Sequence, residues 1–186
     1  MNLQYNIQNW LENNQVINLS GTMTALGASL VPESISNAIK DSLNKFIDID
    51  ALQAEASITI SKSTGAEAGC ITACVASGIC NSIAAAMTGV NLGLAEELPN
   101  TDKIDKTEVV ILKGHVVSYG SNINQKIKLS GANPVEVGTS TAANIYQLRH
   151  SISEKTCAAL WVVSHHTVQS GLLDLKTFVK ICHEND

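Results

Sequence analysis

The chain has 186 residues, of which 45% are hydrophobic and 16% charged, a composition typical of one globular protein with a substantial core. Its formal net charge is −5 and Arg149 is its only arginine, so it lacks the basic surface with which proteins bind nucleic acids. The five cysteines form no CxxC pair, and the N-terminus lacks the apolar core of a secretion signal. We therefore expect reduced thiols and a cytoplasmic protein that binds neither nucleic acid nor membrane.

The first 64 residues carry helical patterns separated by polar loops. A short helix is expected at residues 6–12, and residues 16–21 favour a short strand or an extended segment before a glycine-containing loop. The next helix begins at residues 32–34, because proline suits the first helical turn and glutamate suits the positive end of the helix dipole. A further helix is expected at about residues 49–61. We predict a helical N-terminal segment over residues 1–64.

Beyond residue 64, short β-branched runs alternate with helical patterns. The strand-like runs lie at residues 68–72, 108–112, 134–137 and 158–164, and the candidate helices at 75–87, 122–130, 141–150 and 173–183. Strands that alternate with helices imply right-handed βαβ crossovers and a parallel sheet. We predict an α/β fold with a mainly parallel sheet and flanking helices over residues 65–186.

The last helical pattern is followed by only a few residues. In a βαβ array such a helix leads to another buried strand, which favours a truncated domain. An α/β domain that closes with a helix is the alternative, and the pattern supports both equally.

Three predicted strand ends carry residues that are suited to ligand binding. Thr72-Ala73-Cys74 lies at a strand-to-helix junction, where backbone N–H groups can hold a phosphate, although an ordinary turn is the simpler interpretation and neither a Walker loop nor a GxGxxG turn is present. His115 directly follows the run 108–112, where an imidazole could stack on a flat ring, exchange protons or be solvated. Ser164-His165-His166 ends the run 158–164.

These residues converge on one edge if the sheet is parallel, because the carboxyl ends of parallel strands meet there. We do not expect a metal site, since His165 and His166 are adjacent on a strand and point to opposite faces. Cys74 could be an activated thiolate at a helix start, but a buried, unreactive thiol is the simpler expectation.

Several segments, in this order and spacing, also carry a family resemblance. They are residues 16–21, 46–52, 64–68, 114–117 and 163–169. Together they resemble the selenocysteine-synthase-like branch of fold-type-I pyridoxal-phosphate (PLP) enzymes, and within it the D-glucosaminate-6-phosphate ammonia-lyase group. The resemblance covers nearly the whole chain. It implies part of an aspartate aminotransferase-like, PLP-transferase large domain preceded by a helical segment.

The resemblance also implies a role for each candidate residue. Thr72, Ala73 and Cys74 match the phosphate cup, although Ala73 and Cys74 stand where relatives usually have serine and glycine. His115 matches the residue that stacks on the pyridine ring. Ser164, His165 and His166 match a loop near the ring hydroxyl and the substrate. Asn18, Ser20 and Thr22 lie in the family's N-terminal active-site segment.

The catalytic residues themselves have no counterpart in the chain. The family binds PLP through a Schiff-base lysine and pairs an aspartate with the pyridine nitrogen, and none of the eleven lysines here stands in a matching context. The resemblance therefore implies the N-terminal portion of a lyase that eliminates ammonia or a β-substituent from an amino sugar acid or amino acid, and that is inactive alone. In this family, the run 68–72 would pair with a strand that the chain lacks, so we expect an exposed edge and a homodimer or higher oligomer.

Two other interpretations stay open. The chain could be a non-catalytic remnant, or a pairing subunit that needs a C-terminal half supplied by another chain. It could also be an unrelated α/β binding domain, if the resemblance is accidental.

Overall fold

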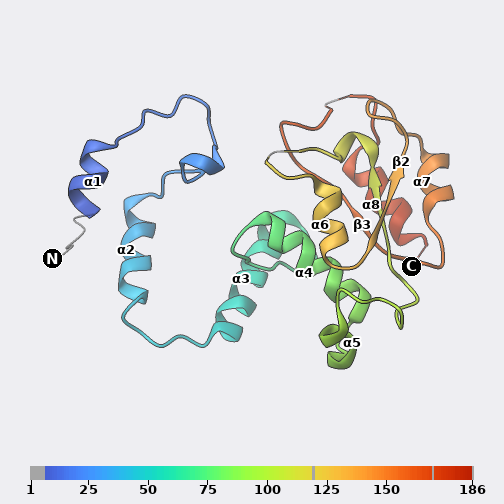
Figure 1. Ribbon diagram of the computed structural model, residues 1–186, viewed down its shortest axis with the longest axis horizontal. Coiled ribbons are helices and arrows are strands. Elements are labelled where there is room, and N and C mark those ends of the chain that lie inside the picture. Colours follow the sequence, from blue (N-terminus) through green and yellow to red (C-terminus); the bar gives the residue numbers. More distant parts are fainter. Residues whose placement is uncertain (1–6, 119, 169, 186) are drawn as a thin grey trace. The chain divides into compact units, whose positions relative to one another are not determined.

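The computed structural model describes residues 7–118, 120–168 and 170–185, so Asn6 and Gln169 of the sequence analysis lie outside the described residues. The chain divides into two compact units, residues 1–52 and 53–186, and each is described by itself (Figure 1). The division falls within helix α3 (Ile49–Thr64). A domain boundary at residue 64 stays a prediction.

The first unit consists of helices without an apolar core. It contains α1 (Ile7–Asn13), the 3₁₀ turn η1 (Thr24–Leu26), α2 (Glu33–Ser42) and the start of α3. The helices expected near residues 6–12 and from residue 32 are therefore confirmed. However, none of residues 7–52 is buried, and Leu30 is 100% exposed. The helices of this unit therefore bury little apolar surface, and the hydrophobic contribution to its stability is small.

Residues 16–21 contain no strand: the segment is irregular, and Asn18 closes a turn with Ser20 and Gly21. The Asn18 side chain accepts the N–H of Ser20 at 2.9 Å and donates to the carbonyl of Gly21 at 2.7 Å. Such local side-chain bonds to the backbone compete with strand pairing, and asparagine makes them readily. The strand alternative for this segment was therefore wrong.

The second unit is built on a three-stranded parallel sheet. Its strands are β1 (Glu108–Leu112), β2 (Asn133–Val137) and β3 (Thr156–Leu160), in the order β2-β1-β3. Both pairs are parallel, and the β1–β3 pair has a register shift after Glu108, so that Cys157 is an additional residue on β3. The predicted α/β fold with a mainly parallel sheet is confirmed.

Helices cover both faces of this sheet because side chains alternate along the central strand. Val109 and Ile111 of β1 pack in one apolar cluster with residues of α4 (Val75–Thr88) and α6 (Ile123–Leu129). Val110 and Leu112 pack on the opposite face with residues of α7 (Ile145–Ser151) and α8 (Leu175–His183) (Figure 1). All four of these β1 side chains are 0% exposed, as expected for a strand between two helical layers.

Residues 68–72, predicted as a buried strand, are irregular in the structure. Within the described chain no strand pairs with them. Instead the Gln53 side chain accepts the N–H of Ile71 at 3.0 Å and donates to its carbonyl at 2.6 Å, and the Gly69 N–H donates to Ser57. A strand needs a neighbouring ladder, and here side chains of α3 satisfy the backbone groups in its place.

Smaller differences concern the ends of elements. β3 ends at Leu160, four residues before the predicted end at residue 164. α7 begins at Ile145 and not at residue 141, because Asn144 and Gln147 form a capping box at that point. The short helix α5 (Leu92–Glu97) was not predicted. No helix in the described part of the chain combines the length and apolarity that crossing a membrane requires.

Candidate functional site

His115 lies at the carboxyl end of the central strand, in a tightly packed turn. Residues Lys113–His115 form a 3₁₀ turn directly after β1. A Cβ at Gly114 would lie 2.7 Å from both the Ser140 carbonyl oxygen and a Leu172 methyl group. Glycine therefore permits the loops after β2 and before α8 to approach the strand end. His115 itself is only 3% exposed.

The imidazole of His115 is held in one orientation. Its Nδ1 accepts the backbone N–H of Val162 at 3.3 Å, which places the proton of the neutral ring on Nε2. The ring packs against Trp161 in an edge arrangement, with centroids 4.4 Å apart at 90°. Burial lowers the pKa of His115, so the neutral form predominates at neutral pH.

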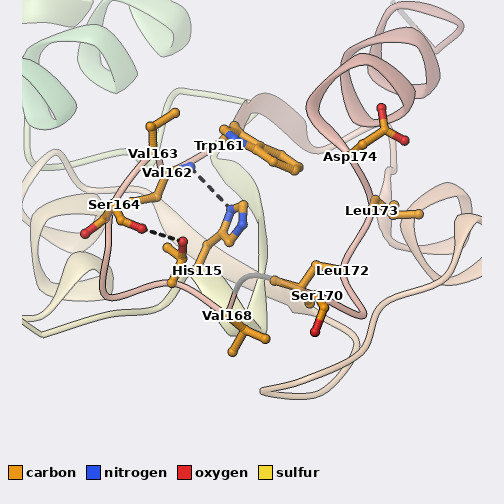
Figure 2. A pocket seen from close by; sticks show the side chains of 11 residues that line it. His115, Trp161, Val162, Val163, Ser164, Val168, Ser170, Leu172, Leu173 and Asp174 are labelled. Atoms are coloured by element: carbon orange, nitrogen blue, oxygen red, sulfur yellow. Dashed lines mark hydrogen bonds between the residues drawn. The ribbon is translucent and has the colours of Figure 1, made fainter.

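His115 forms one wall of a cavity of 330 Å³ at this edge of the sheet (Figure 2). The other walls are Trp161 to Ser164, directly after β3, and six residues between Thr167 and Asp174. Figure 2 shows the His115 ring directed toward the backbone of Val162, with Trp161 beside it. An aromatic and apolar wall with a few hydroxyl groups is the usual composition of a small-molecule site.

Two polar residues of the cavity also fix its loops. The Thr167 hydroxyl donates to the Ser164 carbonyl at 2.7 Å and closes the turn between them. Asp174 caps α8 by accepting the N–H and hydroxyl of Thr177 at 2.9 and 2.7 Å. These two bonds, the side-chain bond first, lower the pKa of Asp174. The carboxylate is therefore bound to the helix that begins beside the cavity.

The predicted cluster at the strand ends is only partly assembled around this cavity. His115 and Ser164 line it together. His165 and His166 are exposed outside the lining, and their rings lie 4.0 Å apart at an interplanar angle of 39°. The roles of these two histidines stay predictions.

The Thr72-Ala73-Cys74 turn is organised as a helix cap outside that lining. Cys74 is the N-cap of α4, and its side chain and that of Ser77 form a capping box. The Thr72 hydroxyl donates to the Cys74 carbonyl at 2.9 Å. The Cys74 thiol is exposed, and hydrogen bonding to the backbone and then the side chain of Ser77 lowers its pKa. Cys74 is thus not the buried thiol that we expected, and phosphate binding by this turn stays a prediction.

The proposed N-terminal residues belong to the first unit. Asn18, Ser20 and Thr22 are exposed there, and Asn18 forms the turn described above. Their role in substrate binding stays a prediction. In the described ranges no group of three or more histidine, cysteine or acidic side chains is arranged to hold a metal ion.

A buried lysine was missed by the sequence analysis. Lys126 of α6 is 2% exposed, and its ammonium group donates to the carbonyls of Ser121 and Asn122 at 3.0 and 3.2 Å. Burial lowers its pKa, and the ammonium group is close enough to Cys74 to affect that thiol. The sequence feature that could have indicated its burial is its position beside Ile123 and Ile127, within the apolar stripe of the helix.

The fold and the cavity define an α/β domain with a cavity at the carboxyl ends of parallel strands, where such domains bind ligands. The model of the L-seryl-tRNA selenium transferase family matches residues 16–185, and the chain belongs to this family. This confirms the resemblance to selenocysteine-synthase-like proteins.

Individual relatives are considerably longer than this chain. A protein of Salmonella typhimurium named D-glucosaminate-6-phosphate ammonia lyase is 39% identical over 180 residues, which are 97% of this chain and 48% of that protein. A 5'-C-glycyluridine monooxygenase-decarboxylase of Streptomyces is 27% identical over 91% of this chain and 43% of its own length. The solved structure of a D-glucosaminate-6-phosphate ammonia-lyase superposes with a TM-score of 0.86 at 39% identity, over 98% of this chain and 49% of that one. The chain therefore spans about half the length of these relatives.

Proposed function

We propose that this chain forms part of a PLP-dependent lyase that removes ammonia or a β-substituent from an amino sugar acid or an amino acid. The observation that carries the proposal is the buried, oriented His115 beside a cavity at the strand ends, in a chain 39% identical to a protein named as an ammonia lyase. In the proposal the complete enzyme is a cytoplasmic homodimer or higher oligomer with a small amino compound as substrate.

The residues around the cavity fit the ring of such a cofactor. A neutral imidazole with a fixed plane can pack against a pyridine ring without charge repulsion, and Ser164 offers a hydroxyl from the opposite loop. The cavity volume of 330 Å³ lies at the lower end of the range of small-ligand pockets, roughly 300–1,000 Å³. When bound, PLP would supply an electron sink for carbanion chemistry.

In this proposal each part of the chain has a distinct task. His115 orients the ring and, with Trp161, excludes water from one side of it. Ser164 and His165 hydrogen-bond the ring hydroxyl, and His166 contacts the substrate. Asn18, Ser20 and Thr22 of the first unit are separate candidates for substrate contact. The start of α4 at Thr72 to Cys74 receives the phosphate, supported by the positive end of a 14-residue helix.

The covalent attachment of the cofactor requires a group from elsewhere. No lysine is among the residues that line the cavity, and Lys113, the nearest in sequence to His115, forms an ion pair with Glu136 at 3.4 Å. We therefore propose that the isolated chain orients the cofactor without catalysing the reaction. A second candidate function is a pairing subunit that acts with a complementary chain, and the half-length match to relatives agrees with either candidate.

Trp161 makes the cofactor proposal directly measurable. The chain has two tryptophans, and in a Trp10→Phe variant Trp161 is the only one, 4.4 Å from the His115 ring. Saturating PLP should quench this fluorescence, and a further His115→Ala change should abolish most of the quenching. The matched control is His150→Ala, at an exposed position on α7, which should retain it. Unchanged fluorescence in the first variant, or equal quenching with and without His115, would contradict the proposal.

A further inference from the structure

Trp161 connects the apolar core of the sheet to the histidine of the cavity. It is the first residue after β3, and its half-buried side chain lines the cavity. The same side chain packs against the apolar cluster that contains Val110 and Leu112. Its indole ring lies 4.4 Å from the ring of His115 and 5.2 Å from that of Phe178, measured between centroids. Trp161 is therefore in contact with both a core residue and the wall of the site.

The hydrogen bond of His115 does not by itself fix the plane of the imidazole. The distance from Nδ1 to the backbone nitrogen of Val162 is 3.3 Å, slightly beyond the usual range for an N–H donor, roughly 2.7–3.2 Å. A bond at one ring atom also leaves the ring able to tilt about that atom. The edge contact with Trp161, at an interplanar angle of 90°, opposes this tilt because the imidazole would lose the contact or collide with the indole (Figure 2).

Trp161 is itself held from the side of α8. The Phe178 ring meets the indole at an interplanar angle of 60°, and Phe178 is only 2% exposed. The Phe178 N–H donates to the carbonyl of Asp174 at 2.9 Å and so closes the first turn of α8, which the Asp174 side chain caps. A buried ring in a capped helical turn has few alternative positions. Phe178 can therefore keep Trp161 in place beside His115.

The residue type at position 161 matters for this contact. An aliphatic side chain could fill space against the apolar cluster, but only a flat ring offers the imidazole an edge contact with a defined angle. The indole also helps to cover a histidine that is only 3% exposed although it lines a cavity. A role confined to core packing would explain neither the partial exposure of Trp161 nor its contact with His115.

We infer that Trp161 is a positioning residue, which fixes the ring plane and the tautomer of His115 and thereby the surface that this histidine presents to a ligand ring. The identity of that ligand as PLP rests on the proposed function. The positioning itself concerns two residues of this chain, so the experiments have one arm without PLP and one arm with it.

The first arm is nitrogen NMR of the histidine-labelled chain without PLP, at a pH of about 8, where a histidine of ordinary pKa is neutral. His115→Gln assigns the resonances. In the wild type the two ring nitrogens should give the well-separated signals of a single Nε2–H tautomer. Trp161→Leu should move these signals toward each other as the ring exchanges between orientations, and Trp161→Phe should restore most of the separation. Unchanged signals in a folded Trp161→Leu variant would overturn the inference.

The second arm measures the affinity for PLP by equilibrium dialysis. We expect Trp161→Leu to weaken binding by up to about tenfold, the range that loss of one aromatic contact allows. Trp161→Phe should stay within about threefold of the wild type, because it keeps a flat ring. Equal affinity of Trp161→Leu and the wild type would overturn the inference. A wild-type chain that binds no PLP would contradict the proposed function, and the first arm alone would then decide whether Trp161 positions His115.

A matched control separates positioning from general core stability. Ile181 of α8 is 2% exposed and belongs to the apolar cluster against which Trp161 packs, and no ring contact links it to His115 in the described chain. Ile181→Val should lower the urea denaturation midpoint, as Trp161→Leu does, yet leave the His115 signals and the PLP affinity at wild-type values. Circular dichroism verifies that each variant is folded. If Ile181→Val reproduced the effects of Trp161→Leu on His115, Trp161 would be a core residue only and the inference would fail.

Discussion

The helices of the two units have similar sequence patterns and caps, but only those of the second unit pack against a sheet. α2 in the first unit follows Pro32, its N-cap, and has an apolar side, yet none of its residues is buried. α6 in the second unit is shorter, yet Ile123 and Ile127 are 0% exposed because they pack on β1. The difference shows that helical pattern and capping determine where a helix forms, whereas a sheet face determines whether the helix contributes a core.

Truncating one apolar side chain in each unit should give the largest contrast. Ile111 is 0% exposed in β1 and Leu30 is 100% exposed in the first unit. We expect Ile111→Ala to lower the free energy of unfolding by about 2–5 kcal/mol, because it leaves a cavity between two helical layers. Leu30→Ala should change it by less than about 0.5 kcal/mol. Urea denaturation followed by far-ultraviolet circular dichroism measures both, and equal losses would contradict the contrast.

A substitution at the strand end sharpens the comparison within the second unit. Gly114→Ala should lower the free energy of unfolding by about 1–3 kcal/mol, because the new Cβ would lie 2.7 Å from the Ser140 carbonyl oxygen and cannot be accommodated without movement. Gly93 on α5 meets only the Asn91 side-chain oxygen, which caps the helix, and at the longer distance of 3.3 Å. Gly93→Ala is therefore the control and should change the free energy of unfolding less than Gly114→Ala does. Thermal unfolding of the two variants in parallel gives the answer. A wild-type midpoint for Gly114→Ala would show that the loops are not held at this distance.

The smallest expected effect is a pH dependence that arises at His115. Burial lowers the pKa of this histidine in the folded state below its ordinary value of 6.5. Above pH 6.5 both states are neutral and the full stability is present; as the pH falls below 6.5 the unfolded state takes up the proton first, so stability is lost toward the folded-state pKa. The loss is at most about 1.4 kcal/mol per pH unit of that window.

His115→Gln should remove this part of the pH dependence of unfolding, whereas His150→Gln, at an exposed position, should retain it. Denaturation midpoints measured at intervals from neutral to mildly acidic pH distinguish the two. The account of His115 as a buried neutral base fails if both variants follow the wild type.

The sequence was most informative where local preference and tertiary packing agree. The β-branched run at Glu108–Leu112 predicted β1 with the observed bounds, because every side chain of a central parallel strand faces a helical layer. The position of His115 followed from the same reasoning. Residues 68–72 have a similar apolar character but no neighbouring strand in the described chain, and pairing is a tertiary property that no local pattern contains.

The position of the cavity could be predicted from the sequence, but not all of the residues that line it. Strand ends predicted His115 and Ser164, which share the cavity. Trp161 fell within the strand predicted at residues 158–164, whereas the observed strand β3 ends at Leu160. The loop that leads to Asp174 has no periodic pattern from which a cavity wall could be inferred. Lys126 was overlooked because a lysine in an apolar stripe is usually assigned to the helix surface.

Nitrogen NMR of the His115 side chain tests the central claim most directly, because it reports the tautomer and the ligand at the same atoms. The structure predicts a neutral ring at neutral pH with its proton on Nε2, and Nδ1 hydrogen-bonded to Val162. Saturating PLP should shift the His115 nitrogen resonances and leave those of His150 in place. A protonated His115 at neutral pH, or resonances that do not move when PLP is added, would contradict the account.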